Sequence, residues 1–139
     1  MAQLNADKAD VLMANQTFYR ALSAGSIEGI SAAFAQDGNV TALLEMSKEI
    51  ALGWPAVLAV WRDVPFDAFS ELSVVMTDPV IEVNGLVAWA VGLEKIRGKM
   101  KSGEEFAWTG RGTNIFEKRG SEWLIVHHHA SKAAEDLLS

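Results

Sequence analysis

The stretch WLIVHHHAS, from Trp123 to Ser131, contains all three histidines of the chain. A histidine titrates near neutral pH and can carry a proton or bind a metal through a ring nitrogen. If the stretch is a strand, alternate side chains point to opposite faces, so the three imidazoles cannot act as one cluster. Strict alternation places His128 and Ala130 on one face. It places Trp123, Ile125, His127 and His129 on the other.

A carboxylate stands among small residues in another predicted strand. Glu94 continues the face formed by Leu86, Ala88, Ala90 and Gly92, which leaves room for a helix or a ligand. A buried carboxylate is costly unless it is paired. If Glu94 and His128 approach each other, each stabilises the charged form of the other, and the two form a candidate catalytic acid/base pair.

Three further side chains are candidates for ligand binding, and each also has a structural interpretation. Asn15 and Tyr19 lie on the apolar face of a predicted helix, where a buried amide or hydroxyl either bonds a neighbour or faces a polar cavity. Trp61 lies on the buried face of a later helix, where it packs in the core or forms a platform for a ligand. Arg111 is a possible partner for Glu94, but its alternation within a long predicted strand is opposite to that of Asn114, so we expect it on the outer face.

The segment Gly110–Arg111–Gly112 resembles a phosphate-binding loop only superficially. It lacks the lysine and the following helix that such loops have. Glycines inside a strand more often indicate a bend or a bulge.

Composition excludes several classes of protein. The chain has 139 residues, half of them hydrophobic and 22% charged, which is typical of one globular domain over residues 1–139. The absence of cysteine excludes disulfides, thiolate catalysis and cysteine–zinc sites. The net charge of −6 disfavours binding to nucleic acid. The densest basic group, Arg97, Lys99 and Lys101, stands beside Glu104 and Glu105, as in a solvated hairpin.

No segment is apolar for the ~20 residues that a membrane-spanning helix requires. The longest candidate, 86–93, fits a strand. The N-terminal MAQLNADKAD lacks the basic region and apolar core of an export signal, so we expect a cytoplasmic protein. We expect neither a bound metal nor an organic cofactor.

The first half of the chain has helical periodicity. In residues 6–24 the stripe continues from Val11 to Leu22 at helical spacing, and Gly25 is a plausible end. Ser26 can cap a second helix that ends near Asp37. A short strand over residues 39–44 follows, and Pro55 opens a third helix that stops before Val64-Pro65.

The pattern of the second half predicts β-strands. Asn84-Gly85 is a strong hairpin signal between strands 79–83 and 86–97. Two further turns separate strands 104–118 and 122–131. Three helices followed by a four-stranded antiparallel meander indicate an α+β fold.

These elements resemble the SnoaL-like group of the NTF2-like superfamily. The segments that carry the likeness are NQTFYRALSAGSIEGISAAFAQDGNVT, ALGWPAVLAVWRDVPF, VNGLVAWAVG and TNIFEKRGSEWLIVHHHAS. The superfamily includes ketosteroid isomerase, scytalone dehydratase, polyketide cyclases and the association domain of the calmodulin-dependent kinase. The resemblance implies a cone-shaped fold in which three N-terminal helices pack on a curved antiparallel sheet and enclose a pocket. It does not imply one chemistry, because this fold hosts both enzymes and non-enzymes.

Functional residues of these relatives transfer only in part. The tyrosine and the aspartate base of ketosteroid isomerase align with Thr17 and Ala42, so the resemblance does not extend to that mechanism. The last strand is similar to that of the association domain, whose pocket arginines align with Asn114 and Ala130. The resemblance therefore places Asn114 and His128 in the pocket.

The opposite face, with Trp123, His127 and His129, is too apolar to be exposed to water, and we expect a second copy of the chain to cover it as a twofold dimer. The alternative is a metal site at His127 and His129, roughly 6–7 Å apart on one strand. No acidic residue lies near them in the sequence.

The sequence predicts a binding protein for a small apolar or carbonyl-bearing molecule. Two alternatives remain open: an isomerase, dehydratase or cyclase that needs no cofactor and uses a pocket histidine, and a dimerisation module.

Overall fold

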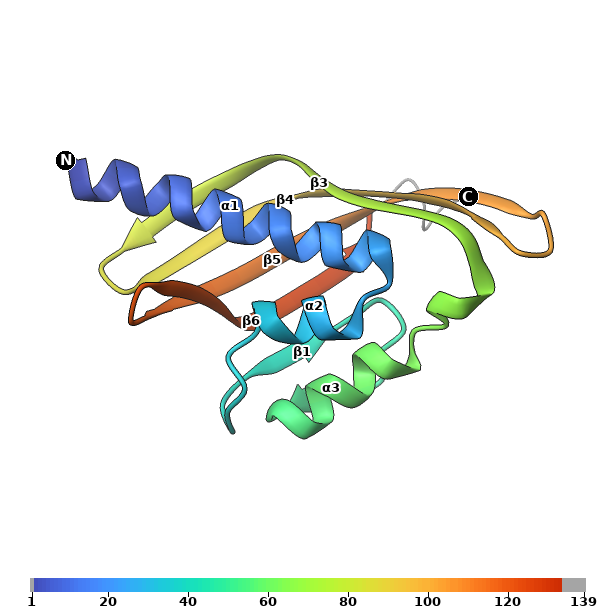
Figure 1. The fold of residues 1–139 in the computed structure, drawn as a ribbon, viewed down its shortest axis with the longest axis horizontal. Helices are drawn as coiled ribbons and strands as arrows, with labels where there is room; N and C mark the ends of the chain where they lie inside the picture. Colours follow the sequence, from blue (N-terminus) through green and yellow to red (C-terminus); the bar gives the residue numbers. More distant parts are fainter. Residues whose placement is uncertain (1, 134–139) are drawn as a thin grey trace.

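Three helices lie against one face of a curved six-stranded sheet, which confirms the predicted α+β cone (Figure 1). The computed structural model describes residues 2–133. The sheet order is β2-β1-β6-β5-β4-β3, and neighbours are antiparallel except for the parallel pair β1 and β6. The helices are α1 (Ala2–Ala24), α2 (Ile27–Ala33) and α3 (Trp54–Asp63), with a 3₁₀ turn, η1, at Phe66–Ala68. The strands are β1 (Thr41–Leu43), β2 (Ala51–Leu52), β3 (Phe69–Asn84), β4 (Val87–Met100), β5 (Glu105–Arg119) and β6 (Glu122–Lys132).

Helix α1 crosses the inner face of the long strands (Figure 1). Its buried residues include the predicted stripe Val11, Asn15, Phe18, Tyr19 and Leu22. The helix begins at Ala2, before the predicted start at residue 6. Asp7 is also buried on this helix, and its carboxylate accepts a 3.2 Å ion-pair contact from Lys118. Helix α1 therefore brings one amide and one phenol to the inside of the cone.

Helices α2 and α3 close the narrower side of the sheet (Figure 1). The predicted cap of α2 is confirmed, since Ser26 Oγ accepts the N–H of Gly29 at 3.0 Å. The helix ends at Ala33, earlier than predicted, because the next residues bridge to β6 and Ala35 donates its N–H to the Ile125 carbonyl at 2.9 Å. Helix α3 begins after Gly53, whose φ of +85° favours glycine, and carries Pro in its first turn as predicted.

Strand β3 is much longer than the predicted strand over residues 79–83. It begins at Phe69 and contains a bulge, since its pairing with β4 moves from Thr77–Leu93 to Val80–Val91. Asp78 lies in this bulge with φ of +44°. The bulge interrupts the alternation of apolar residues, so the pattern predicted only the segment after it. The two-residue strand β2 was not predicted.

A second bulge reverses part of the predicted alternation in β6. The pairing with β5 steps from Ile115–His127 to Phe116–Ile125, which leaves Val126 as an extra residue. Trp123 and Ile125 are therefore in the hydrophobic core, on the same face as His128 and Ala130. The prediction that Trp123 shares the outer face with His127 and His129 is wrong for this reason.

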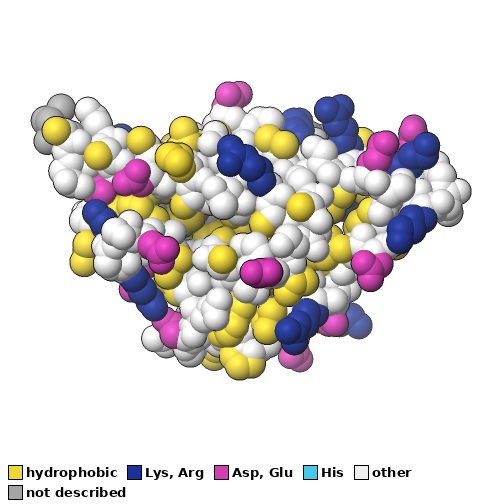
Figure 2. Space-filling model, viewed as in Figure 1, with side chains coloured by type: hydrophobic (Ala, Val, Ile, Leu, Met, Phe, Trp, Pro, Cys, Tyr) yellow, Lys and Arg dark blue, Asp and Glu magenta, His cyan; other side chains and the backbone are white. Residues whose placement is uncertain are grey.

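The helix-covered face carries acidic and basic side chains that are scattered among hydrophobic ones (Figure 2). No helix within residues 2–133 is long and apolar enough to cross a membrane.

Candidate active site

Four elements bring polar side chains together on the inner face of the sheet. Helix α1 supplies Asn15 and Tyr19, β4 supplies Glu94, β5 supplies Asn114, and β6 supplies His128. Each of the five is at most 3% exposed. Buried polar groups require partners, and these five satisfy one another.

The five side chains form a directed chain of hydrogen bonds. The Tyr19 hydroxyl donates to Glu94 Oε2 at 2.5 Å and accepts from Asn114 Nδ2 at 3.1 Å. The same amide nitrogen donates to Asn15 Oδ1 at 2.9 Å, and Asn15 Nδ2 donates to Met76 Sδ at 3.5 Å. Because both donors of Asn114 point at oxygen atoms, its Oδ1 is the acceptor for His128 Nδ1 at 2.5 Å.

This arrangement determines the tautomer of His128. With Nδ1–H donating to Asn114, the other ring nitrogen, Nε2, keeps its lone pair. The pKa of His128 is lowered to about 3, mainly by burial and also by His127 and His129. His128 is therefore a neutral acceptor. The expected acid/base pair does not form, because Asn114 and Tyr19 separate His128 from Glu94.

Glu94 is the titratable group of the site. Its pKa is raised to about 7, mainly by burial and also by Glu45, against the opposing effect of the Tyr19 hydrogen bond. The same burial and the nearby Glu94 raise the pKa of Tyr19, so the phenol keeps its proton. At neutral pH about half of the Glu94 side chains carry a proton, which is the condition that suits a general acid or base.

Two glycines of β5 make room for the Glu94 carboxyl group. A Cβ at Gly112 would lie 2.6 Å from Glu94 Oε2, and one at Gly110 would lie 3.4 Å from Oε1. The pairing of β4 with β5 is regular here, so the glycines do not mark a bulge. They allow the carboxyl group to lie flat against the neighbouring strand.

A cavity of about 170 Å³ opens beside Glu94 and His128 between the sheet, α3 and the loop after β1. Most of its lining is aliphatic or aromatic, and Trp61 lies on its wall, 5.4 Å from the His128 ring. Among the described side chains only the indole nitrogens of Trp61 and Trp123 are closed off without a partner. Glu94 Oε1 and His128 Nε2, which have no protein partner within residues 2–133, are therefore accessible from the cavity.

Glu45 is a cavity residue that the sequence did not reveal. It lies in the turn closed by the hydrogen bond from Ser47 N to the Leu44 carbonyl. Burial raises the pKa of Glu45, and the nearby charges of Lys132 and His129 oppose that effect. The residue stands in a polar loop without periodicity, so no sequence signal could place it in the cavity.

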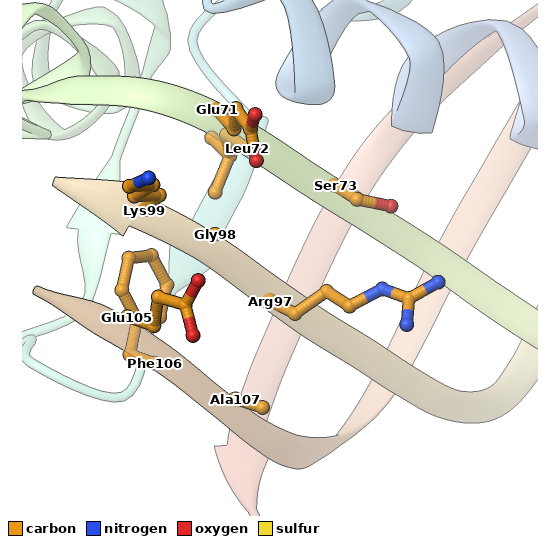
Figure 3. A pocket seen from close by; sticks show the side chains of 9 residues that line it. All are labelled: Glu71, Leu72, Ser73, Arg97, Gly98, Lys99, Glu105, Phe106 and Ala107. Atoms are coloured by element: carbon orange, nitrogen blue, oxygen red, sulfur yellow. The ribbon is translucent and has the colours of Figure 1, made fainter. Parts of the chain in front are cut away.

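A second hollow lies on the outer side of the β4–β5 hairpin (Figure 3). It is an open groove of about 570 Å³ whose lining includes Gly98 and Phe106. Arg97 and Glu105 at its rim are exposed, and it holds charges of both signs. Exposed charges of this kind are screened by water, so we place the chemistry in the inner cavity.

The outer face of β6 shows a different arrangement. His127 Nδ1 bonds to Thr41 Oγ1 at 2.7 Å, His129 is exposed, and the two rings are 6.3 Å apart. No group of three or more His, Asp or Glu side chains within residues 2–133 could hold a metal ion. Arg111 also lies on this face, as expected, and donates to the Lys132 carbonyl at 2.8 Å.

Helices on the concave face of a curved sheet, with a polar group buried beside an apolar cavity, define the class of cone-shaped α+β proteins. The sequence profile of the SnoaL-like domain matches residues 11–135, and the chain belongs to that family. No curated protein sequence matches it.

Solved structures show the same fold. A candidate dehydratase of the NTF2-like family from Streptomyces avermitilis is 23% identical, with a TM-score of 0.81 over 93% of this chain and 98% of that one. A candidate calcium/calmodulin-dependent kinase II association domain from Xanthomonas campestris is 22% identical, with a TM-score of 0.72 over 86% and 82%. One from Thiobacillus denitrificans is 26% identical, with a TM-score of 0.69 over 86% and 92%.

Proposed function

We propose that the chain binds a compact, largely apolar molecule in the inner cavity and that Glu94 exchanges a proton with it. The observation that carries the proposal is one carboxyl group with two distinct oxygen atoms. Oε2 is held by Tyr19 at 2.5 Å, and Oε1 is open to the cavity. With a pKa of about 7, the group can take a proton and return it at neutral pH.

The size of the cavity limits the ligand. An apolar cavity of about 150 Å³ holds benzene, so 170 Å³ accepts a molecule of one or two small rings. Isomerisation, dehydration and cyclisation all include a proton transfer that a carboxylate can perform without a cofactor. His128 would act as a neutral wall residue that accepts a hydrogen bond, and Asn15, Asn114 and Tyr19 would hold the two acceptors in place.

A generic carbon acid tests this proposal. In 5-nitrobenzisoxazole, removal of the proton from carbon 3 breaks the N–O bond and releases a coloured nitrile phenolate, so a desolvated carboxylate alone suffices. We expect turnover that rises with pH and levels off above about pH 7, as Glu94 loses its proton. Glu94→Gln should abolish it, whereas Glu49→Gln, at an exposed position outside the cavity, should not. Equal rates in wild type and Glu94→Gln would refute the base.

A second candidate function, self-association, is favoured by the outer face of the sheet. Trp89, Val91 and Leu93 of β4 alternate along this face at 37%, 41% and 45% exposure, and Val75 and Val80 of β3 are also exposed. A contiguous apolar surface of this kind usually marks an interface. Several solved structures with this fold are described as association domains or as a hub homology domain.

We therefore propose a homodimer in which the outer faces of two copies pack together. Trp89 would take the central place that the sequence suggested for Trp123, and His127 and His129 would lie at its border. Sedimentation analysis should show a dimer for wild type and a monomer for Val91→Lys. A wild-type monomer at micromolar concentration would refute it.

A further inference from the structure

The charged side chains that line the cavity are acidic. Glu45 and Glu94 are its ionisable acids, and no Lys or Arg belongs to the lining. His128 adds no positive charge, because burial lowers its pKa to about 3. The Glu45 carboxylate raises the pKa of Glu94 and of Tyr19, and the Glu94 carboxylate also raises the pKa of Tyr19. An anionic ligand would add to this repulsion, and a cation would relieve it.

The hydrogen-bonding groups of the cavity agree with the charges. Glu94 Oε1, His128 Nε2 and the Glu45 carboxylate are acceptors. The side-chain donors of the lining are the indole groups of Trp61 and Trp108, and that of Trp61 is closed off from the cavity. Once Glu94 has lost its proton, a ligand that bonds to these acceptors must supply donors, which a carbonyl group cannot do.

The aromatic lining offers a third attraction for a cation. Five of its residues are aromatic: Trp61, Phe66, Phe69, Phe106 and Trp108. The face of an aromatic ring attracts a cation, most strongly when the pair is removed from water. The chain itself provides an example at this site, since the Lys132 ammonium group lies 5.4 Å from the centre of the Trp108 ring. The charge of Lys132 also lowers the pKa of Glu45.

We infer that the ligand of the cavity is a compact organic cation, a protonated amine carried on an apolar body of one or two small rings. The ammonium group would lie between Glu45 and Glu94 and donate to their oxygen atoms, and the ring would contact the aromatic wall. This inference rests on the proposed function, because it names the class of molecule that binds in the same cavity.

Three probes of nearly equal shape test the inference: benzylamine, benzyl alcohol and benzoate, which differ in charge at one position. Ligand-observed NMR titration of the full chain near pH 8 measures their dissociation constants. We expect benzylamine to bind at least about tenfold more tightly than benzyl alcohol, and benzoate to bind most weakly. Glu45→Gln and Glu94→Gln should each reduce the preference for benzylamine by about threefold or more. Glu49→Gln changes the net charge equally outside the cavity and should leave the preference unchanged.

The outcomes separate this inference from the function on which it rests. If benzyl alcohol binds as tightly as benzylamine, the cavity binds small molecules but the preference for a cation is refuted. If Glu49→Gln reduces the preference as much as Glu45→Gln, net charge alone causes it, and the inference is refuted as well. If none of the probes binds, the small-molecule function itself is overturned. A benzylamine preference that depends on both Glu45 and Glu94 supports both.

Discussion

Replacing Glu94 by glutamine should stabilise the protein, and the gain should depend on pH. The side chain is buried, and folding raises its pKa from 4.5 to about 7. Burial therefore disfavours the carboxylate relative to the protonated form. Glutamine keeps the shape and can accept the Tyr19 hydrogen bond through its carbonyl oxygen, but it never ionises.

The size of the effect follows from the shift in pKa. The difference between 7 and 4.5 is 2.5 pH units, and each unit corresponds to about 1.36 kcal/mol, which gives about 3 kcal/mol. A group whose pKa is raised on folding contributes its full stability below the unfolded pKa and loses it as the pH rises through the folded pKa. The free energy of unfolding of Glu94→Gln, minus that of wild type, should therefore increase by about 3 kcal/mol between about pH 4.5 and pH 7.

If only wild type were measured, the titration of His128 would mask this effect. Its pKa falls from 6.5 to about 3 on folding, so its contribution decreases as the pH falls below 6.5. Between about pH 4.5 and 6.5 the unfolded chain has a proton on His128 and the folded chain has one on Glu94, so the two slopes cancel. The variant should lose stability on acidification over this range by about 1.4 kcal/mol per pH unit relative to wild type.

Urea unfolding followed by tryptophan fluorescence, at several values from about pH 4.5 to 7.5, measures both proteins. Taking the difference removes the contribution of every group that the two proteins share. The exposed Glu49→Gln serves as a control and should differ from wild type by a constant amount. A constant difference for Glu94→Gln as well would show that the carboxyl group of Glu94 does not carry a raised pKa.

The other predictions concern neighbours of Glu94 and the two faces of the sheet. Tyr19→Phe removes the hydroxyl that stabilises the carboxylate, so the pKa of Glu94, measured by ¹³C NMR titration, should rise; an unchanged or lower value would contradict the geometry. Gly112→Ala places a Cβ 2.6 Å from Glu94 Oε2 and should lower stability by about 1–3 kcal/mol, and a neutral effect in urea unfolding would show that the carboxyl group moves freely. Trp123→Ala truncates a core side chain and should lower the free energy of unfolding by about 3–5 kcal/mol. Trp89→Ala, on the exposed face, should lower the free energy of unfolding of one subunit much less, and equal losses would contradict the assignment of the faces.

Much of the buried network could be predicted because helices and regular strands have fixed periods. Asn15 and Tyr19 follow from helical spacing in α1, and Glu94 follows from alternation along β4. Asn114 and His128 were placed on the inner face by resemblance to the association domain, and the structure has both buried there. Their mutual hydrogen bonds did not follow, because registers between distant strands are not encoded in a local pattern.

The rest of the site depends on features that local patterns do not carry. Glu45 enters the cavity through a turn, where backbone direction changes at every residue and no period exists. The apolar outer face was predicted, but from the wrong tryptophan. Strict alternation places Trp123 on the outer face, whereas the exposed apolar surface belongs to β4 and includes Trp89.

The bulge at Val126 explains both why alternation failed and how one strand serves two environments. If β6 alternated regularly through Val126, Trp123 and Ile125 would lie on the face opposite to His128, and the core would lose its largest ring from β6. With it, the first half of β6 fills the core, and the second half presents His128 to Asn114 on the same side. The bulge also leaves His127 outside, bonded to Thr41 of the parallel neighbour β1. Three adjacent histidines thus have three different surroundings, and only the middle one can reach the cavity.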